Sequence, residues 1–219
     1  MAGILGGGTS NPGPSIAPRI QSSTQGRAHN IGAGLNRVAG NLIDVDDFTA
    51  TPVSSGGKGA GGTGKGATGQ YTYTVSFIIS IGETMAQINT VYNGNDIDFL
   101  VAPSVQVLAD LAALGITPTY GNTFGITFKL GDYAQSAWSY WASKHPSKAL
   151  AYRGEALACL ANLGLGSSPT LPNFTFEVLW PLNTDVAALG PDANPADWVS
   201  AFLTNADWGI GFPSQLLAT

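Results

Sequence analysis

The amino-acid sequence predicts an α+β fold that is mainly antiparallel β-sheet, a barrel or sandwich with about three helices and an extended N-terminal arm. Apolar and polar residues alternate over 70–81, which is typical of a strand with one buried face. Asn93-Gly94 separates two β-like runs and is a dipeptide that tight hairpin turns favour. From Arg19 to Phe48, short β-like segments alternate with glycines, as in a barrel or sandwich with tight bends.

The chain of 219 residues is expected to divide into an arm, residues 1–18, and a β-rich domain, residues 19–219. The arm consists largely of Gly, Pro, Ser and Asn without periodicity, so it is expected to be extended, or disordered until neighbours order it. The glycine-rich segment 56–69 is predicted to be a long, flexible hairpin loop between two strands.

Two of the three predicted helices lie in the middle of the chain. Residues 104–114 place apolar side chains on one face, between Pro103 and Gly115. Residues 132–145 begin at a plausible cap, Asp132, and end before Pro146. The second helix is expected to carry an aromatic stripe of Tyr133, Ala137, Trp138 and Trp141. Apolar strands are predicted within 123–131, 148–165 and 173–182.

The third predicted helix, residues 195–205, has the clearest start signal. Asn194 is a favoured cap, Pro195 fits the first helical position, and Asp197 places negative charge in the first turn. The apolar face consists of Trp198, Val199, Phe202 and Leu203. This face is expected to be either core or an interface. If it were core, truncation of Trp198 or Phe202 would cost about 3–5 kcal/mol.

Charge is scarce along the chain. Only 11% of the residues are Asp, Glu, Lys or Arg, whereas an ordinary soluble domain has about 25%. A poorly charged surface suits a subunit packed among other subunits, because interface cores are depleted of charge. The net charge of −5 and the pI near 4.7 argue against a nucleic-acid partner. No signal peptide starts the chain and no apolar run approaches about 20 residues, so no membrane association is expected when it is made.

The segment "GAGGTGKG", residues 59–66, matches most of a phosphate-binding loop, with Gly59, Gly64 and Lys65 at the required spacing. Such a loop needs a Ser or Thr directly after the lysine to hold Mg²⁺, and Gly66 stands there. It must also open a helix, whereas a strand is predicted to follow. The three residues are therefore assigned to a flexible loop, and no cofactor is expected.

No catalytic or metal-binding set emerges from the titratable residues. His29 and His145 lack Cys or carboxylate partners at metal spacing in the sequence. Two Asp pairs at strand spacing, each able to bind a hard cation, are better explained as solvated strand positions: Asp44 with Asp46, and Asp96 with Asp98. Cys159 lies among apolar residues and is expected to be a buried thiol. The chain is therefore not expected to be an enzyme.

Four stretches, in order, resemble the N-terminal part of phage tail hub proteins, the central tail-tip proteins of siphophages and the baseplate hubs of contractile phages. They are "RIQSSTQGRAHNIGAGLNRVAGNLI", "YTYTVSFIISIGETMAQINTVYNGNDI", the run from "LGDYAQSAWSYW" to "NFTFEV", and "NPADWVSAFLTNADWGIGFP". Two departures stand out. Trp208 takes the place of a usual Tyr, and Gly82-Glu83-Thr84-Met85 replaces an acidic Gly-Pro-Ile turn.

The resemblance implies a hub-type barrel or sandwich and a structural role in the virion, at the phage tail tip or baseplate hub. Such a protein is made in the host cytoplasm, forms a trimer about the tail axis, and links the tail tube and distal tail protein to the tip and the tape measure end. Hubs usually continue for hundreds of residues beyond this point, so a short or split hub completed by a second hub chain is expected. The expected interface residues are Trp198, Phe202, Trp208, Phe212, Leu216 and Leu217.

Two other functions remain open on the sequence. The aromatic content also allows a receptor-binding or adhesion module of the tail. A tail-associated cell-wall hydrolase would need a paired acid or a metal site. Assembly state separates them, because a hub associates with tail proteins or trimerises, whereas a hydrolase acts as a soluble monomer.

Overall fold

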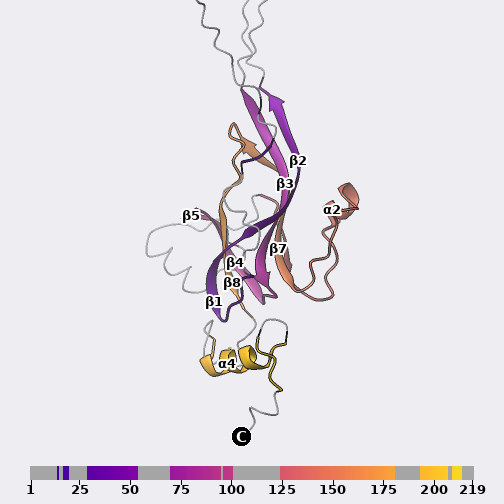
Figure 1. Cartoon of the computed structure of the whole chain (residues 1–219). Helices are drawn as coiled ribbons and strands as arrows, with labels where there is room; N and C mark the ends of the chain where they lie inside the picture. The colour runs from indigo at the N-terminus through magenta and orange to yellow at the C-terminus, as the bar shows by residue number, and fades with distance from the viewer. Residues whose placement is uncertain are drawn as a thin grey trace, which may run out of the picture.

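The computed structural model describes residues 14, 17–19, 29–53, 70–94, 96–100, 124–180, 193–206 and 209–213. The described part contains two four-stranded antiparallel sheets and two helices (Figure 1), which confirms the predicted mainly antiparallel α+β class. One sheet has the order β1-β8-β4-β5 and comprises β1 Leu35–Ala39, β8 Phe174–Leu179, β4 Gln87–Asn93 and β5 Asp96–Leu100. The other has the order β2-β3-β7-β6 and comprises β2 Asn41–Pro52, β3 Tyr71–Glu83, β7 Glu155–Gly166 and β6 Thr127–Leu130.

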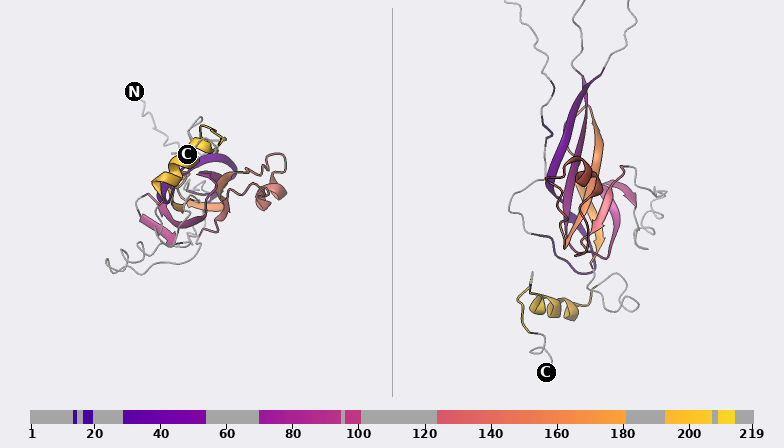
Figure 2. Two further views of the ribbon diagram at one scale, coloured as in Figure 1. Left: turned by 90° about the horizontal axis from the view of Figure 1, so that it is seen from below. Right: turned by 90° about the vertical axis from the view of Figure 1, so that its right-hand side faces the viewer.

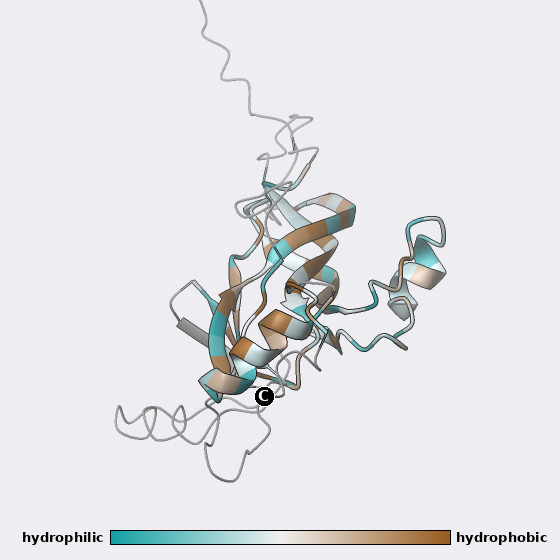
Figure 3. Cartoon of the chain, turned by 60° about the horizontal axis from the view of Figure 1, so that its bottom comes forward, coloured by the Kyte–Doolittle hydropathy of each residue, from teal (hydrophilic) through white to brown (hydrophobic). Residues whose placement is uncertain are grey.

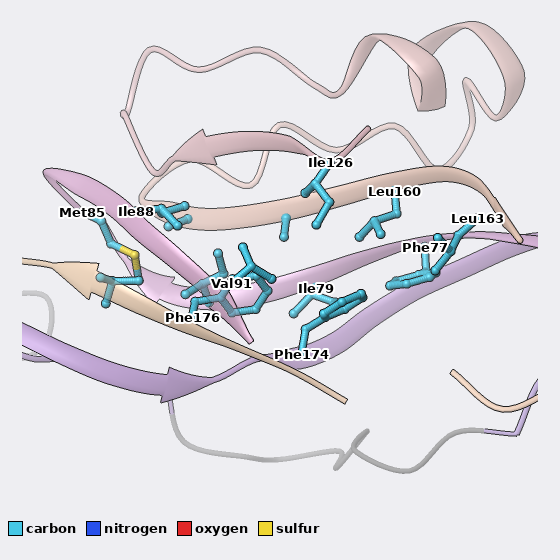
Figure 4. Close-up of a cluster of buried hydrophobic side chains, with 14 of the residues drawn as sticks. Phe77, Ile79, Met85, Ile88, Val91, Ile126, Leu160, Leu163, Phe174 and Phe176 are labelled. Atoms are coloured by element: carbon cyan, nitrogen blue, oxygen red, sulfur yellow. The ribbon is translucent and has the colours of Figure 1, made fainter. Parts of the chain in front are cut away.

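The main hydrophobic core lies between the inner faces of the two sheets (Figure 4). The predicted alternation in β3 is confirmed, because Val75, Phe77 and Ile79 join this core while Ile78 belongs to a separate cluster on the outer face. The β1-β8-β4-β5 sheet contributes large side chains from β4 and β8, including Val91 and Phe176. Successive side chains of β3 point to opposite faces of the sheet, so the strand contributes to the core between the sheets and to the cluster on the outer face.

The polypeptide passes from one sheet to the other at a corner, and Gly40 lies at this corner. This residue separates β1 from β2. A Cβ atom added to Gly40 would lie 2.2 Å from Cγ2 of Ile79, so no larger residue fits without displacing the core. Strands that switch sheets at such corners are a common way to close a sandwich.

Both predicted hairpins are confirmed. β2 pairs antiparallel with β3, and the amide of Val53 donates to the carbonyl of Gln70 (2.9 Å), so residues 54–69 connect paired strands. A strand, not a helix, follows this connection. The loop itself, with Gly59, Gly64 and Lys65, lies outside the described residues. β4 pairs antiparallel with β5, and Gly94 between them has a φ of 65°, the left-handed conformation that Asn-Gly turns use.

The prediction of a helix over 132–145 is wrong in its first half. The helix α2 spans Ser139–Lys144 only and ends before Pro146, as expected. Asp132 instead caps a turn, with its Oδ1 accepting from the amide of Ala134 (2.7 Å). Tyr133 is 62% exposed, so it does not extend the aromatic stripe. α2 lies over the outer face of the β2-β3-β7-β6 sheet (Figures 1 and 2). There Trp138 and Trp141 pack on apolar side chains of β3 and β7.

The predicted C-terminal helix is confirmed as α4, Pro195–Thr204. The side chain of Asn194 accepts from the amide of Ala196 (3.0 Å), and Asp197 lies in the first turn. The predicted helix 104–114 lies outside the described residues, as does most of the arm 1–18. Just after the arm, the amide of Arg19 donates to the carbonyl of Pro169 (2.7 Å) in an isolated parallel bridge. The described helices are too short to span a membrane.

Candidate functional site

Acidic residues of β2 hold the α2 segment, residues 132–152, on the outer face of the sheet. The indole Nε1 of Trp141 donates to Oδ2 of Asp44 (2.7 Å), and Nζ of Lys148 donates to Oδ2 of Asp46 (2.6 Å). Between these contacts, Nε2 of His145 lies 3.1 Å from Oδ1 of Asp47. These contacts form what we call the α2 clasp.

Tyr140 extends the α2 clasp to β7. Its hydroxyl lies 3.0 Å from Oδ2 of Asp47 and 3.2 Å from Oδ1 of Asn162, and it accepts from Ser76 Oγ (3.4 Å). Asp47 and Asn162 have φ values of 54° and 49°, and each lies at an irregularity in the pairing of its strand with β3. A single hydroxyl therefore reaches both strands that flank β3.

Two interpretations from the sequence are corrected by these contacts. Asp44 and Asp46 do lie on an edge strand, β2, but they are not simply solvated, because both accept hydrogen bonds from side chains of the α2 segment. His145 does have carboxylate partners, although Asp47 is 98 residues away in the sequence. The sequence signal was the Asp-Val-Asp-Asp run itself, but nothing local in it indicates which distant segment it faces. Asp96 and Asp98 lie on β5, which is an edge strand.

The α2 clasp contains three groups that metals can use, on Asp46, Asp47 and His145, with ligand atoms within 4.8 Å of one another. Their oxygens already have donors within the chain: Lys148 holds Asp46, and Tyr140 reaches Asp47. Lys148 also keeps the pKa of the Asp46 carboxyl below its ordinary value by hydrogen bonding. A cation would have to displace this ammonium group. The arrangement therefore serves as a polar anchor for the α2 segment.

We expect the contribution of Asp47 to stability to be lost in acid. Burial raises the pKa of the Asp47 carboxyl, but hydrogen bonds from His145, Tyr140 and Ser76 outweigh it and hold the pKa below the ordinary 3.8. Such a carboxylate stabilises the fold fully above its unfolded pKa and loses this effect as the pH falls through its folded pKa. Asp47→Asn should therefore lower the free energy of unfolding by about 1 kcal/mol at neutral pH. The difference from the native chain should shrink as the pH falls below 3.8.

Urea unfolding measured across a pH series tests this expectation, and Glu155→Gln provides a control of opposite sign. Burial raises the pKa of the Glu155 carboxyl above its ordinary 4.5. The stability linked to protonated Glu155 is present below that value and is lost as the pH rises through the folded pKa. A difference for Asp47→Asn that does not change with pH would contradict the role given to its charge.

Glu155 belongs to a second polar cluster, at the end of the same sheet. One of its carboxylate oxygens accepts from Ser80, and the other contacts Nε2 of His29. Nδ1 of His29 lies 3.3 Å from Oε1 of Glu83. A cavity of about 220 Å³ opens here, also lined by Asn30, Asn41, Ile43 and Tyr152.

This second cluster fixes the segment that leads into β1. The side-chain amide of Asn30 donates to the carbonyls of Ile81 (2.8 Å) and Ala39 (3.0 Å), and the amide of Glu83 donates to the carbonyl of Asn30 (3.0 Å). The sequence indicated no partners for His29. Both carboxylate oxygens of Glu155 contact side chains of the same chain, Ser80 and His29. We therefore infer that the cluster attaches residues 29–34 to the sheet.

Cys159 is completely buried, as predicted. It packs with Ile78, Trp138 and Trp141 on the outer face of the sheet. Burial raises the pKa of its thiol to about 12, so the thiol is protonated at neutral pH and is a poor nucleophile.

The predicted interface residues on α4 lie on a helix that the rest of the described structure does not bury. None of the ten residues of α4 is buried; Val199 is 58% exposed and Phe202 is 42% exposed. The rings of Trp198 and Phe202 contact each other, with centroids 5.8 Å apart. Of the two alternatives for this face, core does not hold for Val199 and Phe202, and an interface stays a prediction. Trp208, Leu216 and Leu217 lie outside the described residues.

A turn after α4 enlarges this apolar surface. The amide of Ile210 donates to the carbonyl of Phe202 (2.9 Å), and the amide of Phe212 donates to that of Leu203 (2.7 Å). Ile210 is 52% exposed and Phe212 is 47% exposed. A Cβ atom on Gly209 would lie 2.2 Å from the Phe202 carbonyl oxygen, so the turn requires glycine there. We call the exposed side chains of Val199, Phe202, Ile210 and Phe212 the α4 patch. In Figure 3, which colours the ribbon by hydropathy, hydrophobic and hydrophilic residues alternate along α4.

Comparison with known proteins gives one structural similarity to report. No model of a known protein family and no curated protein matches the sequence. The chain is similar to a solved chain described as "Virion of native gene transfer agent (GTA) particle", with a TM-score of 0.49 and 21% identity. The match covers 85% of this chain and 34% of that chain, so this chain spans about a third of its length.

Proposed function

We propose that the chain is a structural protein of a virion, located at a phage tail tip or baseplate hub. The observation that carries the proposal is the α4 patch. It presents Val199, Phe202, Ile210 and Phe212 to solvent on a helix and turn that hold each other in place. Side chains of this size are usually covered when they cluster on a surface, and assembly with other subunits would cover them.

The stretches that resemble tail hubs also fall on defined parts of the fold. "NRVAGNLI" spans the corner where β1 passes into β2 at Gly40. "GETM", which departs from the acidic Gly-Pro-Ile turn of such hubs, occupies the crossing from β3 to β4, where the amide of Met85 donates to the carbonyl of Leu130 (2.8 Å). "NPADWVSAFLTN" forms α4 with its cap. The two stretches that carry the resemblance, at the β1–β2 corner and at α4, thus each have a structural role, which supports the hub assignment.

In the proposed role, the chain links the tail tube and the distal tail protein to the tip and to the end of the tape measure protein. It would act as a trimer about the tail axis together with a second hub chain, after synthesis in the host cytoplasm. The low charge of the sequence, 11% of residues, suits a subunit with neighbours on several sides.

The proposed role is structural and not catalytic. The strongest candidates for acid–base chemistry, Glu155 and Asp47, have their carboxylate oxygens engaged by side chains of the same chain. These contacts join the segment 29–34 and the α2 segment to the sheet. A hydrolase would instead need one of these groups turned toward an extended substrate.

The test is to purify virions from cells that encode the chain and to detect it with an antibody, by immunoblotting and by immunogold electron microscopy. We expect the chain to band with intact particles and the gold to lie at the tail tip. Absence of the chain from washed particles would contradict a structural role. Gold on fibres only, with binding of the purified chain to host cells, would favour the adhesion module. Lysis of cell walls by the purified chain would favour the hydrolase.

A further inference from the structure

We propose that His29 makes the attachment of residues 29–34 to the sandwich sensitive to pH, and that the segment is held most tightly when the imidazole is protonated. The segment leads into β1 and lies beside the ends of β3 and β8. There the amides of Glu83 and Trp180 donate to carbonyls of the segment (both 3.0 Å). This device goes beyond the virion role and does not depend on it.

Both ring nitrogens of His29 face carboxylates. Nδ1 lies 3.3 Å from Oε1 of Glu83, and Nε2 contacts Oε2 of Glu155. A neutral imidazole carries only one N–H, so its other nitrogen would present a lone pair to a carboxylate oxygen. The imidazolium carries an N–H on each nitrogen and can donate to both carboxylates at once. The geometry of the two contacts therefore favours the protonated ring.

The two carboxylates need the positive charge of His29. Among the described residues, no Lys or Arg forms an ion pair with Glu83 or Glu155, whose side chains are 20% and 16% exposed. Burial, together with the nearby charge of Glu83, raises the pKa of the Glu155 carboxyl. Tyr152, which also lines the cavity, has its pKa raised by burial and stays neutral. Loss of the imidazole proton would therefore leave two sheltered carboxylates without a counter-ion.

The indole of Trp180 opposes the closed position of the segment. A Cβ atom on Gly32 would lie 2.4 Å from Nε1 of Trp180, so the backbone of the segment lies directly against the ring. Trp180 is buried, and its Nε1 has no acceptor among the described residues. A buried donor without an acceptor costs free energy, and water would pair with it once the segment lifts. The polar contacts of His29 and Asn30 offset this cost, so the closed position depends on them.

Mild acid should close the segment, and alkaline pH should loosen it. Histidine is the side chain that ordinarily changes its charge between about pH 5 and about pH 8. A protonated group that the folded chain favours stabilises it at low pH, and this contribution is lost as the pH rises and the proton leaves. Protonation of Glu155, whose pKa is raised, acts with the same sign.

The experiment is hydrogen exchange of the full chain, followed by NMR at about pH 5.5 and about pH 8. The reporters are the amides of Glu83 and Trp180, and the reference is the amide of Met85, which donates to Leu130 outside the segment. Protection factors correct for the intrinsic effect of pH on exchange. They should be about 5-fold higher or more in mild acid for the two reporters, and should change by less than about 2-fold for Met85.

Three variants assign the effect to the imidazole. His29→Gln keeps a hydrogen-bonding side chain that does not titrate, so it should abolish the difference between the two pH values. Glu83→Gln removes one of the two carboxylates and should reduce the difference. His145→Gln is the matched control, because it removes the other histidine of the chain, on the outer face of the sheet, and should leave the difference intact. Thermal melts must show that each variant is folded, and Glu83→Gln replaces His29→Gln if the latter unfolds.

Equal protection of the two reporters at both pH values would overturn the proposal. A difference that persists in His29→Gln would leave this histidine a purely structural role, and one that is also lost in His145→Gln would exclude a local device. A difference that Met85 shares would show general loosening of the fold. The assay uses purified protein, so these outcomes are distinct from failure to find the chain in virions.

Discussion

Phe176→Ala is expected to lower the free energy of unfolding by about 3–5 kcal/mol. Phe176 is fully buried on β8, where its ring fills the space between the two sheets. It meets Phe128 of the opposite sheet edge-on, with ring centroids 6.5 Å apart. Its Cε2 also lies 3.0 Å from the position of a Cβ on Gly40, at the corner between the sheets. Removing the ring leaves a cavity between the two sheets, and the cost grows with the volume that the neighbouring side chains fail to fill.

Urea unfolding followed by circular dichroism measures this loss, and Phe212→Ala is the matched control. Phe212 is 47% exposed in the α4 patch, so its truncation should change the free energy of unfolding by less than about 1 kcal/mol. Similar losses for both variants would mean that the space between the sheets is not the centre of the stable core.

Trp141→Ala is expected to cost a comparable amount, about 3–5 kcal/mol, by detaching the α2 segment. Trp141 is 1% exposed and stacks on Trp138 with ring centroids 5.0 Å apart. Its indole nitrogen also donates to Asp44. Trp141→Phe retains most of the ring packing but leaves the carboxylate without this donor, so it should cost only about 1–2 kcal/mol.

Hydrogen exchange of residues 132–152 shows whether the loss is local. In Trp141→Ala these amides should exchange faster, while the amides of β8, in the other sheet, should remain protected. Tyr133→Ala is the control on the same segment, because Tyr133 is 62% exposed. Loss of protection over the whole sandwich in Trp141→Ala would show that the α2 segment is part of the global core and not a separately attached layer.

Local signals in the sequence were sufficient for β3, for the turn between β4 and β5, and for the start of α4. The strand predicted over 148–165 begins only at Glu155. The alternation in β3, the Asn93-Gly94 turn and the cap at Asn194 each depend on residues within a few positions of one another. Such signals act through backbone conformation and through period, which are properties of the segment itself. For the same reason, the sequence alone showed that Ser or Thr is missing after Lys65 and predicted the strand that follows the loop.

The tertiary structure alone decided what distant segments do together. Residues 132–138 have a helix-like pattern, but the side chain of Gln135 donates to the carbonyls of Ala151 and Tyr152, and the chain forms only a turn before the helix begins at Ser139. His145 meets Asp47 across 98 residues because α2 lies over the sheet to which β2 belongs. The exposure of Phe202 likewise depends on what packs against α4, and its apolar pattern fits core and interface equally. Period and propensity fix the conformation of a segment, whereas its contacts depend on the path of the whole chain.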